Sequence, residues 1–552
     1  MRPTTSQCLV TAFALACSAG AAQAATAPVS PTLNPGLINK QGQRNLNRLE
    51  QGNGLPTPPP VVKSPAKPAS APAAKGPSFL LRGVRVDVTP FLSRSEIDAI
   101  TSRYVGRTAN FGTLQRIVDQ LNQLLTSKRE VTASAYLPPQ TIRKGVVHVA
   151  ILQGRLGALD VTGNRALSAS FVRSYVHVQP HQIVDLPQVA TDLARFNDTG
   201  LARIQAIVRP GSQFGLTDIR LAVTEPPRNL LQVFADNQGV SAVGRDEVGV
   251  LYQRYAPAGI DDRLTLYALK SQGDEMGSLA YDLPIDTTGG RAGFSLTSGN
   301  IRDVSGIYQS LGVSGWSNSV AANVAQPLYV GQNWIWLGTG SLAYEVSKSF
   351  ELDTMVVSDA AKVETVGLKL GYSAPRLSAG GTLNTSFVQS HSQVSEQNTD
   401  FALFGGTFYL RDQLPRRFVG VVSGAWQVST QQFIPGGQLF QVGGPTTVRG
   451  YSSNALAGPS GYYANFELHH PLRIPAYGRF AGAHLDGFVF LDQGGVFNHY
   501  PHYQDLRSVG GGFSWGVSKG VVANLSIGFP IQSTLYGQPG SEVYFSLVAR
   551  LI

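Results

Sequence analysis

Two oppositely charged side chains, far apart in this sequence, are placed to bind each other. Arg449 lies in Val448-Arg449-Gly450-Tyr451, which follows the pair Gly443-Gly444. Asp492 lies in Phe490-Leu491-Asp492-Gln493-Gly494, where Phe490, Asp492 and Gly494 would share one face of a β-strand. A carboxylate on an enclosed face needs a cation, and a guanidinium can bind it through two parallel hydrogen bonds. The residues alone leave two interpretations open: a buried ion pair, or an exposed loop arginine and an unrelated turn aspartate.

The rest of the sequence offers little competing chemistry. Its 9 histidines are scattered and form no His-Glu-x-x-His or other ligand spacing, so we expect no metal site and no cofactor. Gly512–Gly516 and the overlapping Gly516–Gly520 match the pattern G-x-S-x-G. A nucleophile elbow joins a strand to a helix, whereas this run lies among alternating strands, so we expect no enzyme activity. We expect His469-His470 in a loop at the end of a strand.

The N-terminal 24 residues have the pattern of a secretory signal peptide. Arg2 supplies the positive end, an apolar run extends from Cys8 to Cys17, and Ala22-Gln23-Ala24 is a small-x-small cleavage site. Both cysteines of the chain lie inside this segment. The mature chain would contain none, which suits an oxidising envelope. No other stretch is apolar enough for about 18 residues, so we expect no membrane-spanning helix.

A polar segment and a linker follow the signal peptide. Residues 25–52 contain a short amphipathic pattern, with Leu37, Ile38, Leu46 and Leu49 among polar residues, which predicts a helix too marginal to stand alone in water. Residues 53–77 are mostly Pro, Ala, Lys and Ser, as in an extended linker. The alternative is a disordered N-terminal tail.

Two small α+β modules are predicted next, at residues 78–154 and 155–226. In the first, strands near Val84–Val88, Val131–Tyr136 and Val146–Leu152 surround two helices, one capped by Ser95 and one with apolar spacing over Leu114–Leu125. The second module repeats this order and ends at Pro226-Pro227. Such alternation of short strands and helices is typical of an α+β unit.

Residues 227–552 are predicted to form an antiparallel transmembrane β-barrel. Strand after strand alternates one apolar face with one mixed polar face, as Leu231, Val233 and Ala235 do with the residues between them. Lipid offers no partner to an open sheet edge, so such strands must close into a barrel. The fold class is therefore multidomain: two α+β modules followed by a barrel, whose strand count the alternation does not fix.

The charge distribution argues against nucleic acid as a partner. Residues 25–228 hold 24 Lys and Arg against 12 Asp and Glu, whereas residues 229–552 hold 19 against 23. The basic residues are dispersed rather than clustered. A basic surface of this kind suits a polypeptide substrate or anionic lipid in an exported protein.

These motifs together resemble the two-partner secretion transporters of the outer-membrane assembly superfamily. The residues that carry the resemblance are Val448-Arg449-Gly450-Tyr451 after a glycine pair, Phe490-x-Asp492-x-Gly494 downstream, and Leu137-Pro138-Pro139-Gln140 in the first module. The resemblance implies a barrel of 16 strands, two polypeptide-transport-associated (POTRA) modules and a removable plug helix within residues 25–52. It also implies a lumenal loop in which Arg449 meets Asp492 on the inner wall. The chain departs from the common pattern at its end, Leu551-Ile552, where such barrels often have an aromatic residue.

The function implied is export of one large partner protein, of the adhesin, haemolysin or contact-dependent toxin type and encoded nearby, from periplasm to cell surface. Leu137, Pro138, Pro139 and Gln140 would contribute to substrate binding. The resemblance places the chain in the outer membrane as a monomer, in contact with lipid and the barrel assembly machinery. Two rivals remain: an assembly factor of the same superfamily, and a passive porin, which would leave residues 31–226 without a purpose.

Overall fold

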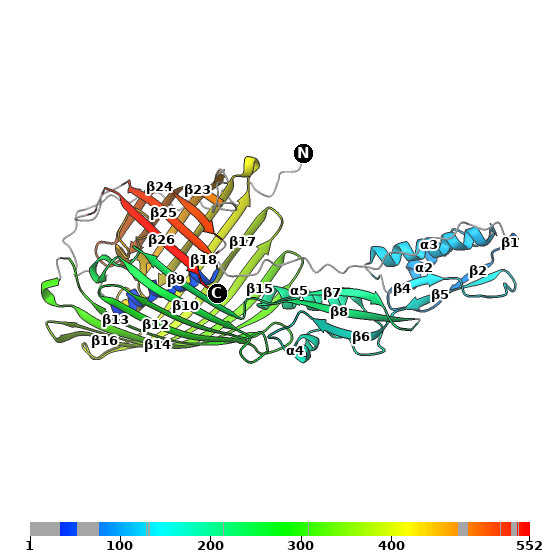
Figure 1. Cartoon of the computed structure of the whole chain (residues 1–552), viewed down its shortest axis with the longest axis horizontal. Helices are drawn as coiled ribbons and strands as arrows, with labels where there is room; N and C mark the ends of the chain where they lie inside the picture. Colours follow the sequence, from blue (N-terminus) through cyan, green and yellow to red (C-terminus); the bar gives the residue numbers. More distant parts are fainter. Residues whose placement is uncertain are drawn as a thin grey trace.

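The computed structural model describes residues 34–51, 77–128, 130, 133–213, 215–306, 309–472, 484–518, 520–531, 538 and 540–552. A large barrel lies at one end, and two small modules extend from it in line (Figure 1). The predicted signal peptide at 1–24 and nearly all of the predicted linker at 53–77 lie outside the described residues. Within the described ranges, no helix is both long and apolar enough to cross a membrane.

The first module packs two helices on a three-stranded sheet. Its sheet has the order β2-β5-β4, with β2 parallel and β4 antiparallel to β5, and a separate pair is formed by β1 and β3. The elements are β1 (Phe79–Leu80), β2 (Gly83–Val86), α2 (Arg94–Thr101), β3 (Thr108–Ala109), α3 (Phe111–Ser127), β4 (Ala133–Tyr136) and β5 (Val146–Gln153). The predicted apolar face of the second helix, from Leu114 to Leu125, is buried against the sheet.

One prediction for this module was wrong by two residues. Helix α2 is capped by Ser93, not Ser95. The Ser93 hydroxyl accepts a hydrogen bond from the backbone N–H of Glu96, and the Glu96 carboxylate accepts one from the backbone N–H of Ser93. This reciprocal capping box satisfies two N–H groups that the first turn would otherwise leave unpaired, so it fixes the helix start at Ser93.

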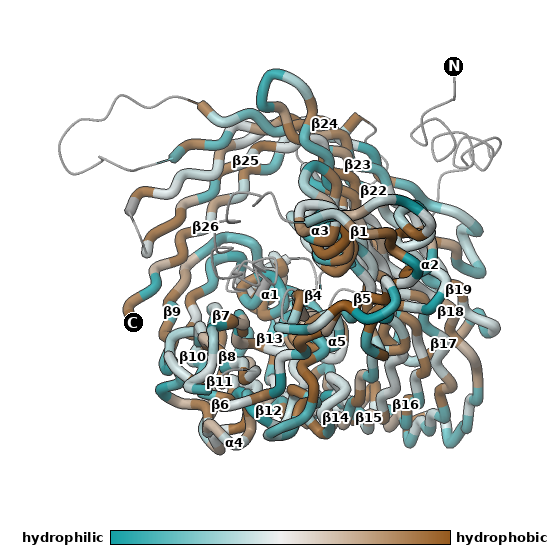
Figure 2. Tube along the Cα trace, turned by 90° about the vertical axis from the view of Figure 1, so that its right-hand side faces the viewer, coloured by the Kyte–Doolittle hydropathy of each residue, from teal (hydrophilic) through white to brown (hydrophobic). Residues whose placement is uncertain are grey.

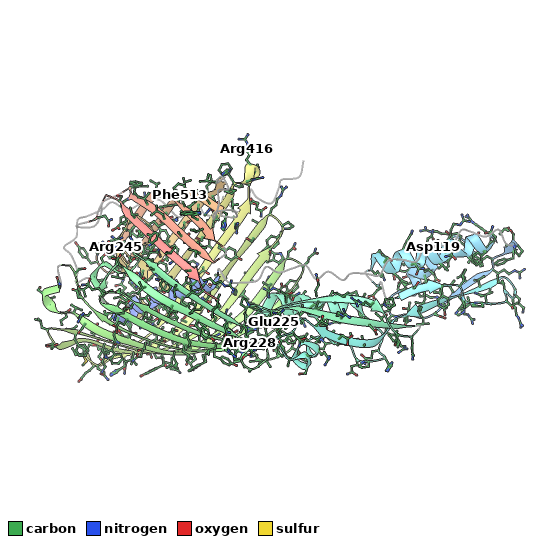
Figure 3. All side chains as sticks on the ribbon, viewed as in Figure 1. Asp119, Glu225, Arg228, Arg245, Arg416 and Phe513 are labelled. Atoms are coloured by element: carbon green, nitrogen blue, oxygen red, sulfur yellow. The ribbon has the colours of Figure 1, made fainter. Side chains whose placement is uncertain are left out.

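The second module repeats the arrangement with a sheet of order β6-β8-β7. Its elements are β6 (Arg155–Thr162), α4 (Ala169–Ser174), α5 (Leu186–Thr199), β7 (Arg203–Pro210) and β8 (Leu216–Thr224). Tyr255 and Ala256, which lie at the start of a barrel turn, are buried in the same apolar core as this module. Figure 3 shows Glu225 and Arg228 where this module meets the barrel.

The barrel closes with 16 antiparallel strands, as the family resemblance implied. The strands are β9 (Asn229–Asp236), β10 (Glu247–Tyr255), β11 (Arg263–Lys270), β12 (Asp274–Pro284), β13 (Arg291–Arg302), β14 (Ser314–Val330), β15 (Trp334–Glu351), β16 (Thr354–Ser373), β17 (Leu377–Ser392), β18 (Gln397–Gln413), β19 (Val419–Ser429), β22 (Ser460–Leu472), β23 (His484–Phe497), β24 (Tyr503–Ser518), β25 (Val521–Pro530) and β26 (Glu542–Arg550). Closure joins the last strand to the first, with Ser546 opposite Asp236 and Arg550 opposite Gln232.

The alternation in the strands sorts their residues between the two faces of the barrel wall. On β9, Gln232, Phe234 and Asp236 are buried toward the lumen, whereas Val233 is exposed on the outside. Helix α1 (Pro35–Gln51) lies inside the ring of strands (Figure 2), where its Leu46 packs with Phe234. The barrel interior is therefore occupied, not an open channel, in this structure.

The observed strands test two expectations from the sequence. Gly512 to Gly516, the first G-x-S-x-G match, lies within β24, where no strand-to-helix turn exists. The expectation that His469-His470 lies in a loop was wrong, because both residues belong to β22. Strand β22 is longer than its apolar pattern indicates, since its inward face carries charged residues that pair within the barrel.

Candidate functional site: the lumenal loop and helix

The connection between β19 and β22, residues 430–459, is built to fold back on itself inside the barrel. It contains η5 (Gly436–Gln438), β20 (Phe440–Val442) and β21 (Leu456–Gly458), and the two short strands pair antiparallel. The turn after β20 uses Gly443 and Gly444 at φ of +110° and +97°, a left-handed region that favours glycine. The Gly443 N–H donates to the Thr447 hydroxyl at 2.8 Å. The glycine pair therefore sets the turn that presents Val448–Tyr451.

The loop carries a small apolar core of its own. Val448 and Tyr451 are completely buried. They cluster with Val442 and Leu456 of the loop and with Val496 and Leu506 of the barrel wall. Because this core is shared between loop and wall, burial of apolar surface holds the loop against β23 and β24.

Arg449 and Asp492 form a two-pronged ion pair on the inner wall. The Arg449 Nε donates to Asp492 Oδ2 and its Nη2 donates to Asp492 Oδ1, both at 2.7 Å. The backbone N–H of Arg449 also donates to Asp492 Oδ2 at 3.0 Å. The Arg449 guanidinium carbon lies 3.6 Å from the ring centre of Phe490, on the same strand face as Asp492. Full burial of the Asp492 side chain requires such a complete set of partners.

The ion pair is extended by residues that sequence reasoning missed. Glu467 of β22 accepts from Arg449 Nη1 at 2.6 Å, and His469 contacts both Glu467 at 2.8 Å and Asp486 at 2.7 Å. Glu467 and His469 are two residues apart and therefore share the inward face of β22. That spacing, together with the position of Asp486 before the Phe490 motif, was a signal available in the sequence.

The backbone around Gly450 is also fixed by residues of β24 and β26. The Gly450 N–H donates to the Tyr544 hydroxyl at 3.0 Å, and that hydroxyl donates to the Tyr451 carbonyl at 2.7 Å. The Tyr451 hydroxyl donates to the Arg507 carbonyl at 3.0 Å. Each residue of Val448–Tyr451 thus has a defined partner. Gly494, the last residue of the second motif, lies on β23 against Val442, where a side chain would clash at 2.8 Å.

Helix α1 is held in the lumen mainly by polar contacts to the wall. The Asn39 amide donates to the Ser317 carbonyl, the Gln41 amide to the Gln238 carbonyl, and Gln253 of the wall donates to Glu50. Leu37 and Ile38 are buried, so the thin apolar stripe found in the sequence also faces protein. Contacts of this kind can be exchanged for water at modest cost.

The same helix also contacts the loop directly. The Asn454 amide donates to Gln41 at 2.9 Å, and the Gln441 amide donates to the Leu37 carbonyl at 3.1 Å. Gly36 and Gly437 approach so closely that a Cβ on Gly36 would lie 3.0 Å from the Gly437 Cα. Helix and loop therefore fill the lumen as one packed unit.

The segment Leu137-Pro138-Pro139-Gln140 lies far from the barrel, at the end of β4 in the first module. Leu137 packs against the module core. The Gln140 side chain makes two hydrogen bonds with the backbone of His148 on β5, at 2.6 and 2.8 Å. Gln140 thereby pairs with β5 just beyond Tyr136, the last residue of β4. The segment closes one end of this sheet edge.

No catalytic chemistry is assembled at this site. Arg449 is held by carboxylates rather than aimed at an open cavity, and no described segment brings together three or more His, Cys, Asp or Glu side chains able to hold a metal. The arrangement holds a loop and a helix in the lumen of the barrel.

A barrel with an apolar outer face, a filled lumen and two small modules at one end defines an outer-membrane β-barrel transporter with POTRA modules. The family model described as haemolysin secretion/activation protein ShlB/FhaC/HecB matches residues 215–522, and the ShlB-type POTRA domain model matches residues 79–154. The chain belongs to this family. It is an outer-membrane transporter, not an enzyme, and exports a partner protein by two-partner secretion.

Individual relatives agree with this assignment. The outer membrane transporter CdiB of Dickeya dadantii is 22% identical, with 93% of this chain and 94% of the relative aligned. The heme/hemopexin transporter protein HuxB of Haemophilus influenzae is 21% identical over 82% of this chain and 83% of the relative. The structure of CdiB from Escherichia coli aligns with a TM-score of 0.70 at 17% identity, covering 96% of this chain and all of that one. BamA from Haemophilus ducreyi shares the fold at a TM-score of 0.52 and 14% identity.

Proposed function

We propose that export proceeds by release of α1 from the lumen, while the loop stays anchored to the barrel wall and the two modules feed an extended substrate to the barrel. The exported partner is a large protein of the adhesin, haemolysin or contact-dependent toxin type, encoded nearby. The observation that carries this proposal is the lumen itself. It is filled by α1 and the loop, which contact each other through Asn454 and Gln41 among others, and α1 is bound to the wall largely by polar contacts that water can replace.

Each segment has a defined part in this mechanism. Helix α1, within the plug segment 25–52, blocks the lumen until substrate arrives. The Arg449–Asp492 pair keeps the loop seated on β23, and Val448, Gly450, Tyr451, Phe490 and Gly494 shape the contact. A buried, fully hydrogen-bonded ion pair defines one loop position, because any shifted position would leave a charge without its partner.

The modules have open sheet edges that an extended chain can pair with. In the first module β2 and β4 are edge strands, and in the second β6 and β7 are. An extended peptide can add to such an edge through its backbone, which recognises an unfolded chain of almost any sequence. Leu137–Gln140 marks the end of β4, because the Gln140 side chain takes the backbone hydrogen bonds of β5 beyond this point. We expect this segment to set where substrate pairing begins.

The transporter makes and breaks no covalent bond, so the driving force is folding of the substrate outside the cell. A folded exterior domain cannot re-enter the lumen. The chain works as a monomer that contacts outer-membrane lipid and is inserted by the barrel assembly machinery.

The test is co-expression with the large exported protein encoded beside this chain, followed by its quantification in medium and periplasm. Arg449→Ala is compared with Arg416→Ala, an exposed arginine on the turn between β18 and β19 (Figure 3). We expect the wild type and Arg416→Ala to release the partner and Arg449→Ala to retain it, with all three inserted equally. Equal release by Arg449→Ala would remove the ion pair from the mechanism.

The same experiment separates the rival functions. If the partner stays in the periplasm with every variant while other outer-membrane proteins change in abundance, the chain is an assembly factor. If small solutes enter but no protein is released, it is a porin.

A further inference from the structure

The outer wall of β11–β15 carries an ordered polar surface near the β11–β12, β13–β14 and β15–β16 turns, at the end of the barrel opposite the modules. We identify the outward-facing residues from their neighbours that face the lumen. A Cβ on Gly299 or Gly315 would contact Asn39 or Pro35 of the lumenal helix. Because side chains alternate along a strand, the neighbours of these glycines, such as Asn300 and Trp316, face outward.

Strand pairing arranges the outward residues into three successive rows. The first row is apolar and exposed: Leu266, Leu279, Leu296, Val320 and Tyr344. The second row holds smaller or polar residues: Ala268, Gly277, Ser298, Asn318 and Val346. The third row is charged or amphipathic: Lys270, Glu275, Asn300, Trp316 and Lys348. Polarity therefore rises in order from the lipid-facing belt toward the cell surface.

A shallow hollow of about 410 Å³ lies within the second and third rows. It is lined by Lys270, Glu275, Gly277, Ser298 and Asn300, among others. Gly277 explains the hollow, because a Cβ at this position would meet no atom within 4 Å. We call this surface the outer-wall hollow.

Cations surround the outer-wall hollow in excess. Lys270 is ion-paired with Glu275, and Arg302 is exposed two residues beyond Asn300 on β13. Lys348 lies over the Trp316 ring at 5.7 Å. Lys270 and Glu275 thus line the hollow, and Arg302 and Lys348 lie beside it. These three cations and one carboxylate give the surface a net positive charge, while the hydroxyl and amide groups of the hollow can bind sugar hydroxyls.

The hollow lies at the level of the membrane where lipid headgroups are found. Trp316 lies four residues from Val320 of the apolar row, which is about 13 Å along a strand. A strand tilted by roughly 45° brings this to about 9 Å above the apolar belt. Tryptophan favours this level, between hydrocarbon and water.

We propose that the outer-wall hollow binds the phosphorylated sugar headgroup of a glycolipid in the outer leaflet of the membrane. Its phosphates are bound by Lys270, Arg302 and Lys348, its sugar hydroxyls by Ser298 and Asn300, and its acyl chains lie on the apolar row. Cations at a membrane surface attract anionic headgroups, and hydrogen bonding to charged oxygens strengthens each contact. The site is thus distinct from the lumenal site and independent of the exported partner.

The test uses the full-length protein, stripped of lipid in detergent and titrated with lipid A carrying two phosphates. Binding is measured by native mass spectrometry and compared with dephosphorylated lipid A. The K270Q/R302Q/K348Q variant removes three charges, and we expect its affinity to fall by roughly tenfold or more. The matched control R376Q/R416Q/R417Q removes three exposed charges from turns at the opposite end of the barrel and should bind as the wild type does.

A second variant tests the hollow without changing its charge. Gly277→Leu fills the space, and its backbone can accept a side chain, so we expect several-fold weaker binding from a fully folded barrel. Heat-modifiable gel mobility checks folding of every variant. The proposal would be overturned if K270Q/R302Q/K348Q and Gly277→Leu both bound lipid A as tightly as the wild type. It would also be overturned if the wild type bound lipid A with and without phosphates equally well. Equal affinity for phosphatidylglycerol would show that charge alone is recognised and would overturn the glycolipid assignment.

Discussion

Gly450 of the lumenal loop and Gly528 of β25 approach each other so closely that neither can carry a side chain. A Cβ on Gly528 would lie 2.5 Å from the Gly450 nitrogen, and Gly450 itself has φ of +88°. The loop therefore contacts two strands of the wall that flank β24: β23 through the Arg449 side chain and β25 through the Gly450 backbone. The glycine next to the arginine is required by space as well as by conformation.

Substitution of Gly528 by valine should displace the loop while leaving the ion-pair residues intact. The new side chain overlaps the Gly450 backbone, and overpacking of this kind costs about 1–3 kcal/mol. We expect protease cleavage within residues 430–459 to become faster and export to fall. Gly420→Val is the control, because a Cβ there meets only Leu414 at 3.5 Å. Equal cleavage rates for the two variants would show that the close approach does not hold the loop.

Removal of Arg449 alone should be more damaging than removal of both members of the pair. Arg449→Ala leaves Asp492 buried without a cation, which typically costs about 3–5 kcal/mol. The Arg449→Ala/Asp492→Ala variant buries no unpaired charge there, because Glu467 keeps its contact with His469. The midpoint temperature is the temperature at which half of the folded gel band is lost. We expect it to be higher for the double variant than for Arg449→Ala, though still below that of the wild type. If the single and double variants lower the midpoint temperature equally, the pair is too well hydrated to act as a buried ion pair.

Asp261 fixes the second module to the barrel. It lies in the turn between β10 and β11, and its carboxylate accepts hydrogen bonds from the backbone N–H groups of Leu201 and Ala202 at 2.8 and 3.0 Å. The Tyr255 hydroxyl donates to it at 2.8 Å, and Arg291 lies 3.2 Å away. Burial raises the pKa of this carboxyl, and Arg291 opposes the rise. One side chain thus joins both domains.

Asp261→Ala should loosen the second module without unfolding either domain. It leaves two backbone N–H groups without their acceptor, at about 1–3 kcal/mol each when buried. We expect a broader distance distribution between spin labels on Arg209→Cys and on Asp353→Cys in pulsed electron resonance. Asp246→Asn, an exposed acid at the other end of the barrel, is the control. A distribution as narrow as that of the wild type would show that the shared apolar core alone fixes the module.

The sequence predicted the domain order and the barrel because strand alternation and helix periodicity are local properties. The pairing of Arg449 with Asp492 was also within reach, because each is an isolated charge in a recognisable motif. The count of 16 strands was not available from alternation alone and came from the family resemblance. Long strands such as β16 include polar ends that carry no clear pattern of their own.

Contacts across the lumen were beyond sequence reasoning. Glu467 and Tyr544 meet the loop only because the closed barrel brings β22 and β26 to it, and His469 contacts Glu467 from the same face of β22. Polar residues on an inward face have no apolar periodicity, so His469 was wrongly expected in a loop. The prediction of Ser95 as the helix cap was wrong because two serines lie close together at this position. Only Ser93 has a glutamate three residues later.

Glu130 should make the joint between the two modules sensitive to pH. It is buried beside the start of α5, where the Leu186 N–H is its hydrogen-bond donor. Burial, together with the charge of Asp185, raises the pKa of Glu130 from 4.5 to about 7. Between pH 4.5 and about 7, Glu130 is therefore protonated in the folded state and ionised in the unfolded state. The contribution of Glu130 to the free energy of unfolding is highest below pH 4.5 and falls as the pH rises through about 7.

Glu130→Gln should therefore raise the thermal stability of the modules at pH 8 and leave it nearly unchanged at pH 4.5. Ellipticity at about 222 nm reports helices, and the described helices α2–α5 all belong to the modules, so it follows their unfolding while the barrel stays folded. Glu96→Gln is the opposite control. A hydrogen bond from Lys128 lowers the pKa of Glu96 to about 2, so its variant should lose stability at pH 7. A Glu130→Gln variant no more stable than the wild type at pH 8 would show that Glu130 is ionised at no cost.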